Sequence, residues 1–159
     1  MEKEKNFQKD NSCDKGAAGG FDNQFTVYFD ALLANEGFAR SMVATFIIGL
    51  NPSVSDISDI KTAVSEAVTN SIVHGYAGKK GKVMIHVGIA GNLVQITVAD
   101  NGVGIPDIAQ ARQPFFTTKA KEERSGMGFT LMESFMDSLD VKPNPSGGVI
   151  VVMKKVIRA

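Results

Sequence analysis

Apolar and polar residues alternate in several short stretches of the chain, which predicts β-strands. The stretches cover residues 25–29, 83–89, 93–99 and 149–157. Gly91-Asn92 lies between the second and third stretches, where this pair of residues is typical of a tight turn between antiparallel strands. We therefore expect 83–99 to form a β-hairpin.

Apolar residues three or four positions apart mark three further stretches and predict helices over about 35–49, 56–74 and 128–139. The apolar stripe of the second helix consists of Ile57, Ile60, Val64, Val68 and Ile72. Gly75 is expected to end this helix, because glycine readily adopts the left-handed conformation. Together the elements predict an α/β protein, more closely an α+β two-layer sandwich. Its helices should cover one face of a mixed, mostly antiparallel sheet.

Two segments lack periodicity. Residues 1–23 are rich in Lys, Asp, Asn and Gly, so we expect a disordered tail ahead of one globular domain over 24–159. Residues 106–125 form a long polar stretch inside that domain. A loop of this length is usually functional, which suggests a lid over a site.

Composition excludes several classes of function. The 17 basic and 17 acidic residues give no net charge, so direct binding to nucleic acid by long-range attraction is not expected. Cys13 is the only cysteine, which excludes a disulfide framework and a cysteine-rich metal site. No apolar run approaches the ~20 residues that span a bilayer. We expect a cytoplasmic protein that does not contact the membrane.

Glu66 and Asn70 are four residues apart in the second predicted helix, so they share a face away from the apolar stripe. The amide oxygen of Asn70 is a suitable magnesium ligand, since magnesium prefers hard oxygen donors. The neighbouring Glu66 could orient a hydroxyl group or water as a base. Taken alone, the pair would more simply be an exposed polar helix face.

Asp100 ends the third predicted strand and is followed by Asn101-Gly102-Val103-Gly104-Ile105. The two glycines let the backbone turn sharply and approach a ligand closely. A carboxylate held at such a turn can accept a hydrogen bond from an exocyclic amine such as the adenine amino group. The simpler interpretation of this segment alone is an ordinary turn. Its spacing matches neither a Rossmann fingerprint nor a Walker A motif.

The segment Ser125-Gly126-Met127-Gly128-Phe129 leads into the last predicted helix. Unhindered glycine amides and the positive end of a helix dipole suit a polyphosphate. The preceding loop offers basic and hydroxyl side chains, namely Lys119, Lys121, Arg124, Thr117 and Thr118. A glycine-rich helix cap would explain this segment alone, but the three segments together favour a site for ATP and magnesium.

These segments together resemble the GHKL ATPase/kinase superfamily, which includes gyrase, Hsp90, the histidine kinases and the mismatch-repair ATPases. Glu66…Asn70 is similar to its N-box, Asp100-x-Gly102-x-Gly104 to its first glycine box, and Gly126-x-Gly128 to its second. Over about 25–157 the chain more narrowly resembles the anti-sigma F factors of spore-forming bacteria. Their motifs are matched at 35–40, 65–70, 74–76, 111–119 and 123–129.

The resemblance implies a Bergerat ATP-binding fold, a homodimer and binding to the sporulation sigma factor F in the forespore. It also implies a serine kinase that uses ATP and Mg²⁺ to phosphorylate, and so inactivate, an anti-anti-sigma partner. In this family Glu66 would orient the substrate serine, Asn70 would hold magnesium and Asp100 would recognise adenine. Arg40 would contact the sigma factor or the partner. The remaining ATP-binding residues would be Gly102, Gly104, Ile105, Thr117, Thr118, Arg124, Ser125, Gly126, Met127, Gly128 and Phe129.

Two features depart from the family pattern. Residues 1–23 have no counterpart in it. Many superfamily members also carry a threonine after the glycine of the last strand, near the adenine-binding carboxylate, whereas here Gly148 is followed by Val149 and Ile150. What supports Asp100 is therefore left open. Two alternative functions remain at this point, a nucleotide-modulated module that only binds a sigma factor and a simple GHKL ATPase.

Overall fold

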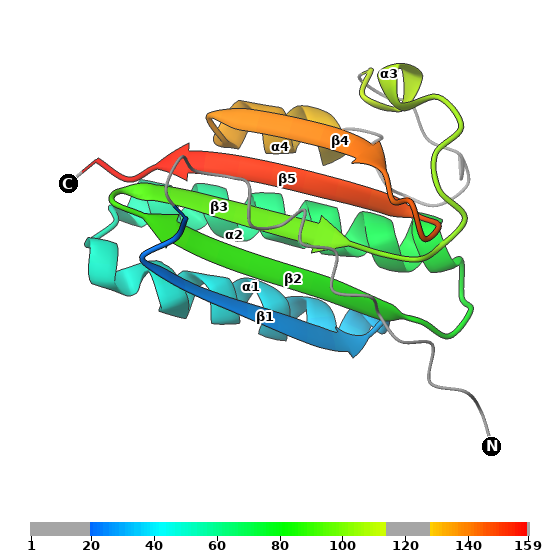
Figure 1. Cartoon of the computed structure of the whole chain (residues 1–159), viewed down its shortest axis with the longest axis horizontal. Helices are drawn as coiled ribbons and strands as arrows, with labels where there is room; N and C mark the ends of the chain where they lie inside the picture. The colour runs from blue at the N-terminus through cyan, green and yellow to red at the C-terminus, as the bar shows by residue number, and fades with distance from the viewer. Residues whose placement is uncertain (1–19, 114–127, 159) are drawn as a thin grey trace.

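The computed structural model describes residues 20–113 and 128–158 (Figure 1). Its elements in chain order are β1 (Asn23–Asp30), η2 (Leu33–Asn35), α1 (Glu36–Phe46), η3 (Ile47–Leu50), α2 (Val54–Asn70), η4 (Ser71–Tyr76), β2 (Lys82–Ala90), β3 (Leu93–Ala99), α3 (Ile108–Ala111), α4 (Gly128–Phe135), β4 (Ser138–Pro143) and β5 (Val149–Val156). None of the helices in these ranges is both long and apolar enough to cross a bilayer.

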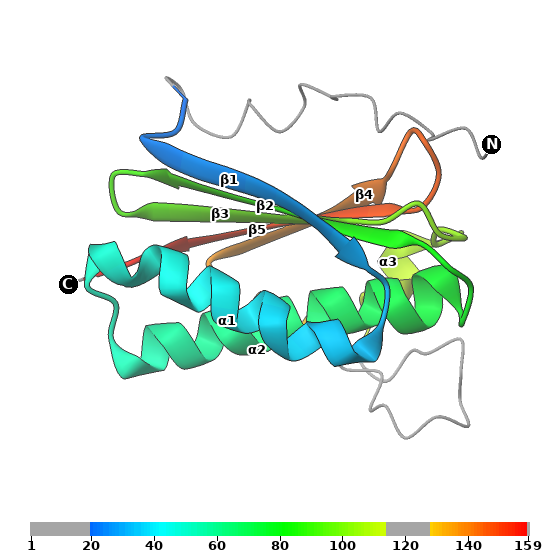
Figure 2. The ribbon, with the colours of Figure 1, turned by 90° about the horizontal axis from the view of Figure 1, so that it is seen from below.

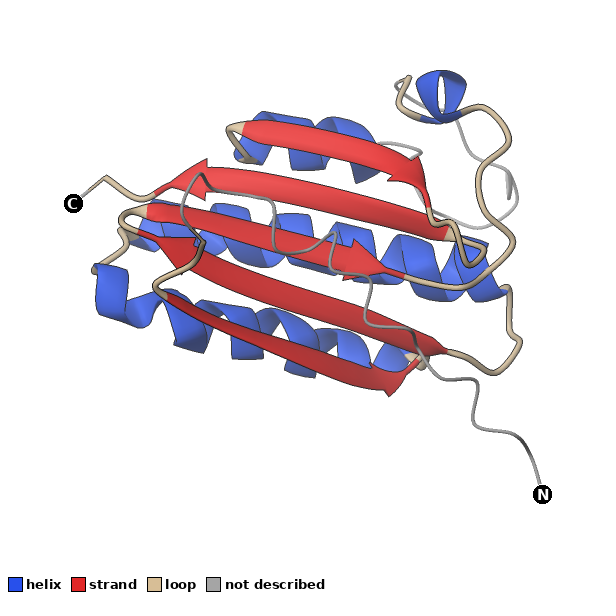
Figure 3. Ribbon diagram, viewed as in Figure 1, coloured by secondary structure: helices blue, strands red, loops and turns tan. Residues whose placement is uncertain are grey.

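The five strands form one sheet in the order β1-β2-β3-β5-β4 (Figure 3). Each of the four pairings is antiparallel, so the sheet is more uniform than the expected mixed sheet. Helices α1 and α2 pack on one face of it (Figure 2). Helix α4 lies on the same side, next to α2 (Figure 1). The predicted two-layer α/β sandwich is confirmed, and residues 83–99 form the predicted hairpin.

The core lies between the helices and the sheet. Ile60, Val64 and Val68 of α2 are completely buried, as the apolar stripe predicts. They belong to the same cluster as alternate residues of the two central strands, among them Val87 and Ile96. Burying such side chains stabilises the fold by about 1.5–3 kcal/mol each. This packing fixes the orientation of α2, and with it the position of the polar residues on its flank.

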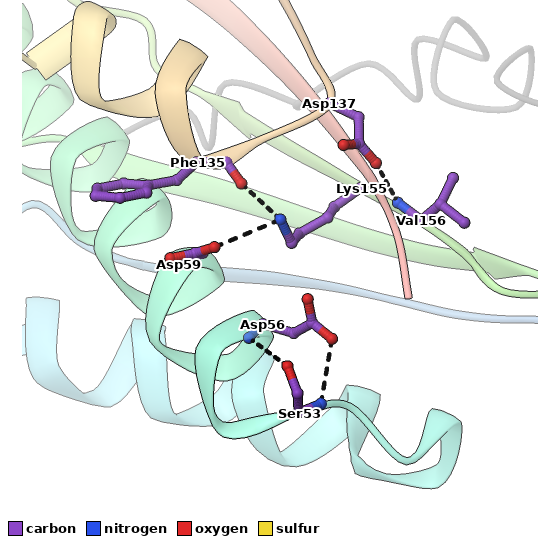
Figure 4. Close-up of polar contacts among 7 residues, drawn as sticks. All are labelled: Ser53, Asp56, Asp59, Phe135, Asp137, Lys155 and Val156. Atoms are coloured by element: carbon purple, nitrogen blue, oxygen red, sulfur yellow. Dashed lines mark hydrogen bonds and ion pairs between the residues drawn. The ribbon is translucent and has the colours of Figure 1, made fainter. Parts of the chain in front are cut away.

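Helix α2 begins two residues earlier than predicted because Ser53 caps it (Figure 4). The Ser53 hydroxyl accepts a hydrogen bond from the Asp56 amide at 3.0 Å, and the Asp56 carboxylate accepts one from the Ser53 amide at 3.1 Å. This reciprocal capping box satisfies two amides that would otherwise lack partners at the helix start.

The prediction that Gly75 ends this helix is wrong. After Asn70 the chain continues as one turn of π-helix, η4, which includes Gly75. The residues with left-handed backbone are instead Ala77, with φ 51°, and Gly78, with φ 83°. Position 75 requires a glycine for a different reason, which is its close approach to Asp100.

The last predicted helix is also too long. Helix α4 ends at Phe135, and residues 138–143 form strand β4, which the periodicity did not reveal. Asp137 directs the chain into the sheet, since its amide donates to Lys154 and its carboxylate accepts from the Val156 amide at 2.7 Å (Figure 4). Strand β4 has only Leu139 and Val141 as inward apolar residues, too few to predict a strand.

Candidate nucleotide-binding site

Helix α2 places Glu66 and Asn70 against the first residue of α4. A Cβ atom at Gly128 would lie 3.2 Å from Oε2 of Glu66 and 3.1 Å from Nδ2 of Asn70. Both side chains are half-buried. The structure therefore brings the acid and the amide of one predicted motif to the helix start that belongs to another.

Asp100 lies at the end of β3 and is only 2% exposed. Its Oδ1 accepts hydrogen bonds from the amides of Gly102 at 2.9 Å and of Val149 at 3.4 Å. Burial raises the pKa of this carboxyl group above its usual value, while the bonds from Gly102, the Ser71 side chain and Val149 act in the opposite direction. A buried acceptor that is held from three sides has a fixed orientation, as recognition of a base requires.

Ser71 is a site residue that the sequence reasoning missed. Its side chain, 5% exposed, hydrogen-bonds Asp100. It supplies the hydroxyl contact that the family pattern would place on a threonine after Gly148. The sequence offers one indication of this role, which is that Ser71 directly follows Asn70. Two consecutive residues thus connect Asn70, the candidate magnesium ligand, to Asp100, the candidate adenine-binding residue.

Three glycines let the backbone close around the Asp100 carboxylate. A Cβ atom at Gly75 would lie 3.2 Å from its oxygens, and one at Gly148, where φ is 94°, would lie 2.5 Å from Oδ1. A Cβ atom at Gly102 would overlap the Gly75 carbonyl group, which accepts a hydrogen bond from the Val103 amide at 2.9 Å. Side chains at Gly75 and Gly148 would displace Asp100, and one at Gly102 would displace the Gly75 backbone, so the three glycines keep the surroundings of the carboxylate compact.

Tyr76 fixes the other side of the same turn. Its hydroxyl donates to the Lys82 carbonyl and accepts from the Asn101 amide at 2.9 Å. Burial raises the pKa of the Tyr76 hydroxyl, so it stays protonated and able to donate. The end of η4, the start of β2 and the turn after Asp100 are thereby joined through one atom.

The remaining predicted site residues have different surroundings. Gly104 has φ 78° and is close to Gly148, while Ile105 packs against the core. The Phe129 side chain is 8% exposed and belongs to the core, so only its main chain can face a ligand. Arg40 lies exposed on α1, where it pairs with Glu36 at 3.6 Å. Thr117, Thr118, Arg124, Ser125, Gly126 and Met127 lie outside the described residues.

The predicted lid is described only up to residue 113. This part contains a short helix, α3, although the spacing of its apolar residues did not predict one. Asp107 begins α3 by accepting a hydrogen bond from the Gln110 amide at 3.0 Å. Arg112 follows it and pairs with Glu133 of α4 at 3.6 Å. This pair connects the first part of the predicted lid to α4, the helix that begins at the candidate site.

Comparison with known proteins decides the family. The model of the histidine kinase-like ATPase domain matches residues 29–155. The anti-sigma F factor of Clostridium kluyveri is 49% identical over 139 residues, which cover 87% of this chain and 98% of the relative. The chain belongs to the anti-sigma F factor family of histidine kinase-like ATPase domains. The anti-sigma F factor of a Thermoanaerobacter species, strain X514, is 50% identical over 86% of this chain and 96% of the relative. The family resemblance predicted from the motifs is thus confirmed.

Solved structures share the fold of this anti-sigma F family member. The RsbU and RsbW domains of a Mycobacterium tuberculosis protein match with a TM-score of 0.62 and 21% identity, over 86% of this chain and 33% of that one. The catalytic domain of the histidine kinase ThkA matches with a TM-score of 0.55 and 19% identity, over 84% of this chain and 96% of that one. At such identities the likeness concerns the fold alone.

Proposed function

We propose that this chain is an ATP-dependent protein-serine kinase that phosphorylates an anti-anti-sigma partner, and that it also binds and inhibits the sporulation sigma factor F, acting as a homodimer. Its membership of the anti-sigma F factors supports a sigma-factor partner, because its relatives carry that name. Its ATPase-type domain supports nucleotide binding.

The observation that carries the proposal is the contact of Glu66 and Asn70 with Gly128. Phosphoryl transfer depends mainly on positioning and on neutralising charge. The reaction requires a base, an oxygen ligand for a metal and a helix start that can bind phosphate. Here Glu66, Asn70 and the start of α4 offer these groups next to one another. Because Gly128 has no side chain, Glu66 and Asn70 can lie directly beside the first residue of α4. An acid and an amide oxygen next to a helix start are the groups that a phosphate–magnesium group would need.

Each residue then has a defined task. The Asn70 amide oxygen would hold Mg²⁺, which supplies charge neutralisation on the phosphates when bound. Glu66 would orient the serine hydroxyl of the partner and accept its proton. The first amides of α4, an eight-residue helix, would bind phosphate oxygens with the help of the helix dipole.

Asp100 would accept a hydrogen bond from the adenine amino group. Its bonds from Ser71, Gly102 and Val149 hold the carboxylate in one orientation. Guanine carries an oxygen at the position where adenine carries its amino group, so it would leave the buried acceptor unpaired and be disfavoured by up to roughly 10⁴-fold. The proposal therefore requires ATP in preference to GTP.

The kinase reaction can be tested with labelled ATP, Mg²⁺ and the anti-anti-sigma partner. We expect acid-stable phosphoserine on the partner, abolished by Glu66→Ala with ATP binding retained. Asp140→Ala, which removes an exposed carboxylate of β4, is the matched control and should leave transfer unchanged. Phosphate release without a labelled partner would indicate a simple ATPase, and no turnover of ATP would indicate a module that only binds. Transfer that persisted in Glu66→Ala would exclude Glu66 as the base.

Binding of the sigma factor can be tested separately through Arg40. This side chain is exposed and has an ion pair only with Glu36 among the pairs described, so its removal should not disturb the core. Arg40→Ala should weaken binding to sigma factor F and leave ATP affinity unchanged. If sigma-factor affinity did not change, Arg40 would lie outside the interface.

A further inference from the structure

The turn between β4 and β5, residues 144–148, lies against the turn that follows Asp100. Nδ2 of Asn144 donates to the Asp100 carbonyl oxygen at 2.9 Å and approaches Oδ1 of Asn101 at 3.3 Å. The Ser146 hydroxyl lies 2.8 Å from the same Asn101 oxygen. Two side chains from a distant segment thus bond the main chain of Asp100 and the side chain of its neighbour.

Asn144 is itself fixed by the turn. Its amide donates to the Gly148 carbonyl at 3.0 Å, and its own carbonyl accepts from the Gly147 amide at 2.9 Å. Its Oδ1 accepts from the Ser146 amide at 3.2 Å. Every polar group of Asn144 therefore has a partner, and its Nδ2 protons point at the Asp100 turn in a defined direction.

The same turn leads directly into the residues that contact the carboxylate of Asp100. The Asp100 amide donates to the Val149 carbonyl at 3.0 Å, and the Val149 amide donates back to Oδ1 of Asp100 at 3.4 Å. Residues 144–149 therefore bond Asp100 at its carbonyl, its amide and its carboxylate. A shift of the turn would move all three groups together.

We propose that Asn144 is a positioning residue that sets the preference of the site for adenine by holding Asp100 in place. This inference rests on the proposed function, in which Asp100 recognises adenine. Hydrogen bonds prefer angles above about 150° and weaken steeply below about 120°, so a carboxylate that turns away from the base loses the strength of that bond. Asn144 acts on the base only through Asp100, so its loss should affect the choice of base more than the binding of phosphates.

Asn144→Asp is the sharpest variant, because it keeps the size of the side chain and removes the donor. Asn144→Ala is a second variant in case the added charge unfolds the turn. Asn92→Ala is the matched control, since Asn92 lies exposed in the β2–β3 turn and bonds Ile157 through its main chain.

The variants can be titrated with ATP and with GTP, both with Mg²⁺. The ATP affinity of the Asn144 variants should be lowered by about tenfold, as expected for two lost hydrogen bonds. The weaker GTP affinity should stay unchanged. Equal losses for both nucleotides would show a merely structural role and overturn the proposal.

A second measurement on the protein without nucleotide separates this inference from the proposed function. The Gly102 amide donates to Oδ1 of Asp100, so its hydrogen exchange reports on the order of the turn. The Gly102 amide should exchange faster in both Asn144 variants than in wild type and in Asn92→Ala. The exchange rate of the Val87 amide in β2 should be the same in all four proteins. Unchanged exchange at Gly102 would overturn the inference. If the wild type bound no ATP, the proposed function would fail, whereas exchange at Gly102 would still decide whether Asn144 holds the turn.

Discussion

Gly128 lies so close to Asn70 that a Cβ atom at position 128 would be 3.1 Å from Nδ2 and 3.4 Å from Oδ1 of that side chain. The last glycine of the second glycine box therefore does more than expose an amide at a helix start. Its missing side chain makes room for the amide of the N-box. The two motifs depend on each other sterically as well as through any ligand that they share.

Replacing Gly128 by alanine tests this dependence. The added methyl group would push Asn70 and Glu66 aside by a few tenths of an ångström, while alanine is well tolerated in a helix. Gly128→Ala should lower Mg²⁺-dependent ATP affinity by at least about tenfold, the effect expected when one charge-assisted contact is lost. The thermal midpoint of unfolding should change little. Gly49→Ala is the matched control, because nothing lies within 4 Å of a Cβ atom there. ATP affinity that was equal in both variants would contradict the account.

Ser71→Ala tests what supports the buried carboxylate. A hydrogen bond to a charged group contributes about 1.5–3 kcal/mol, so its removal should weaken ATP binding by about tenfold or more. Ser55→Ala, in an exposed position at the start of α2, should have no effect. Isothermal titration measures both. Undiminished ATP affinity in Ser71→Ala would show that the two amides suffice to hold Asp100.

The protonation of Asp100 should appear in the stability of the protein. Burial raises the pKa of this carboxyl group, so the folded state binds more protons than the unfolded chain between the ordinary value of 3.8 and the raised pKa. The free energy of unfolding should therefore fall as pH rises through that window. Asp100→Asn lacks this dependence, so its stability relative to wild type should increase over the same window. Chemical denaturation at a series of pH values measures it, and a constant difference would contradict the prediction.

Two lysines form ion pairs of different burial, so their removal should lower the free energy of unfolding by different amounts. Lys155 is 12% exposed in its side chain and bonds the Phe135 carbonyl at 2.8 Å and Asp59 at 3.6 Å (Figure 4). Lys155→Ala should cost about 1–3 kcal/mol of unfolding free energy, because it leaves a part-buried carbonyl group without its donor. Lys82 makes a shorter pair with Asp30, at 2.6 Å, but both side chains are exposed. Lys82→Ala should cost less than about 1 kcal/mol. The reverse order would contradict this reasoning.

Much of the fold could be predicted from periodicity, because the core is built on it. The stripe Ile60/Val64/Val68 and the hairpin of β2 and β3 were both evident from the sequence. Strand β4 was not, since two inward apolar residues form too short a pattern and the end of α4 carries no glycine or proline. What ends α4 is the bonding of Asp137 to β5, a contact between distant residues.

The sequence allowed those residues of the candidate site to be predicted that belong to short motifs. Glu66, Asn70, Asp100 and Gly128 could be named as candidates because three short motifs occur together in one chain and resemble those of a family. The contact of Ser71 with Asp100 could not be predicted, because the chain departs from 3.6 residues per turn from Ser71 onward. The Asn144 contacts could not be foreseen either, since they join two turns more than 40 residues apart.

The most direct test of the account is a calorimetric titration of the full chain with ATP and with GTP, each with and without Mg²⁺. If Asn70, Gly128 and Asp100 all contact one nucleotide, ATP should bind and Mg²⁺ should strengthen its binding. GTP should bind at least about tenfold more weakly than ATP. Equal affinities for the two nucleotides, or no binding of ATP at all, would contradict it.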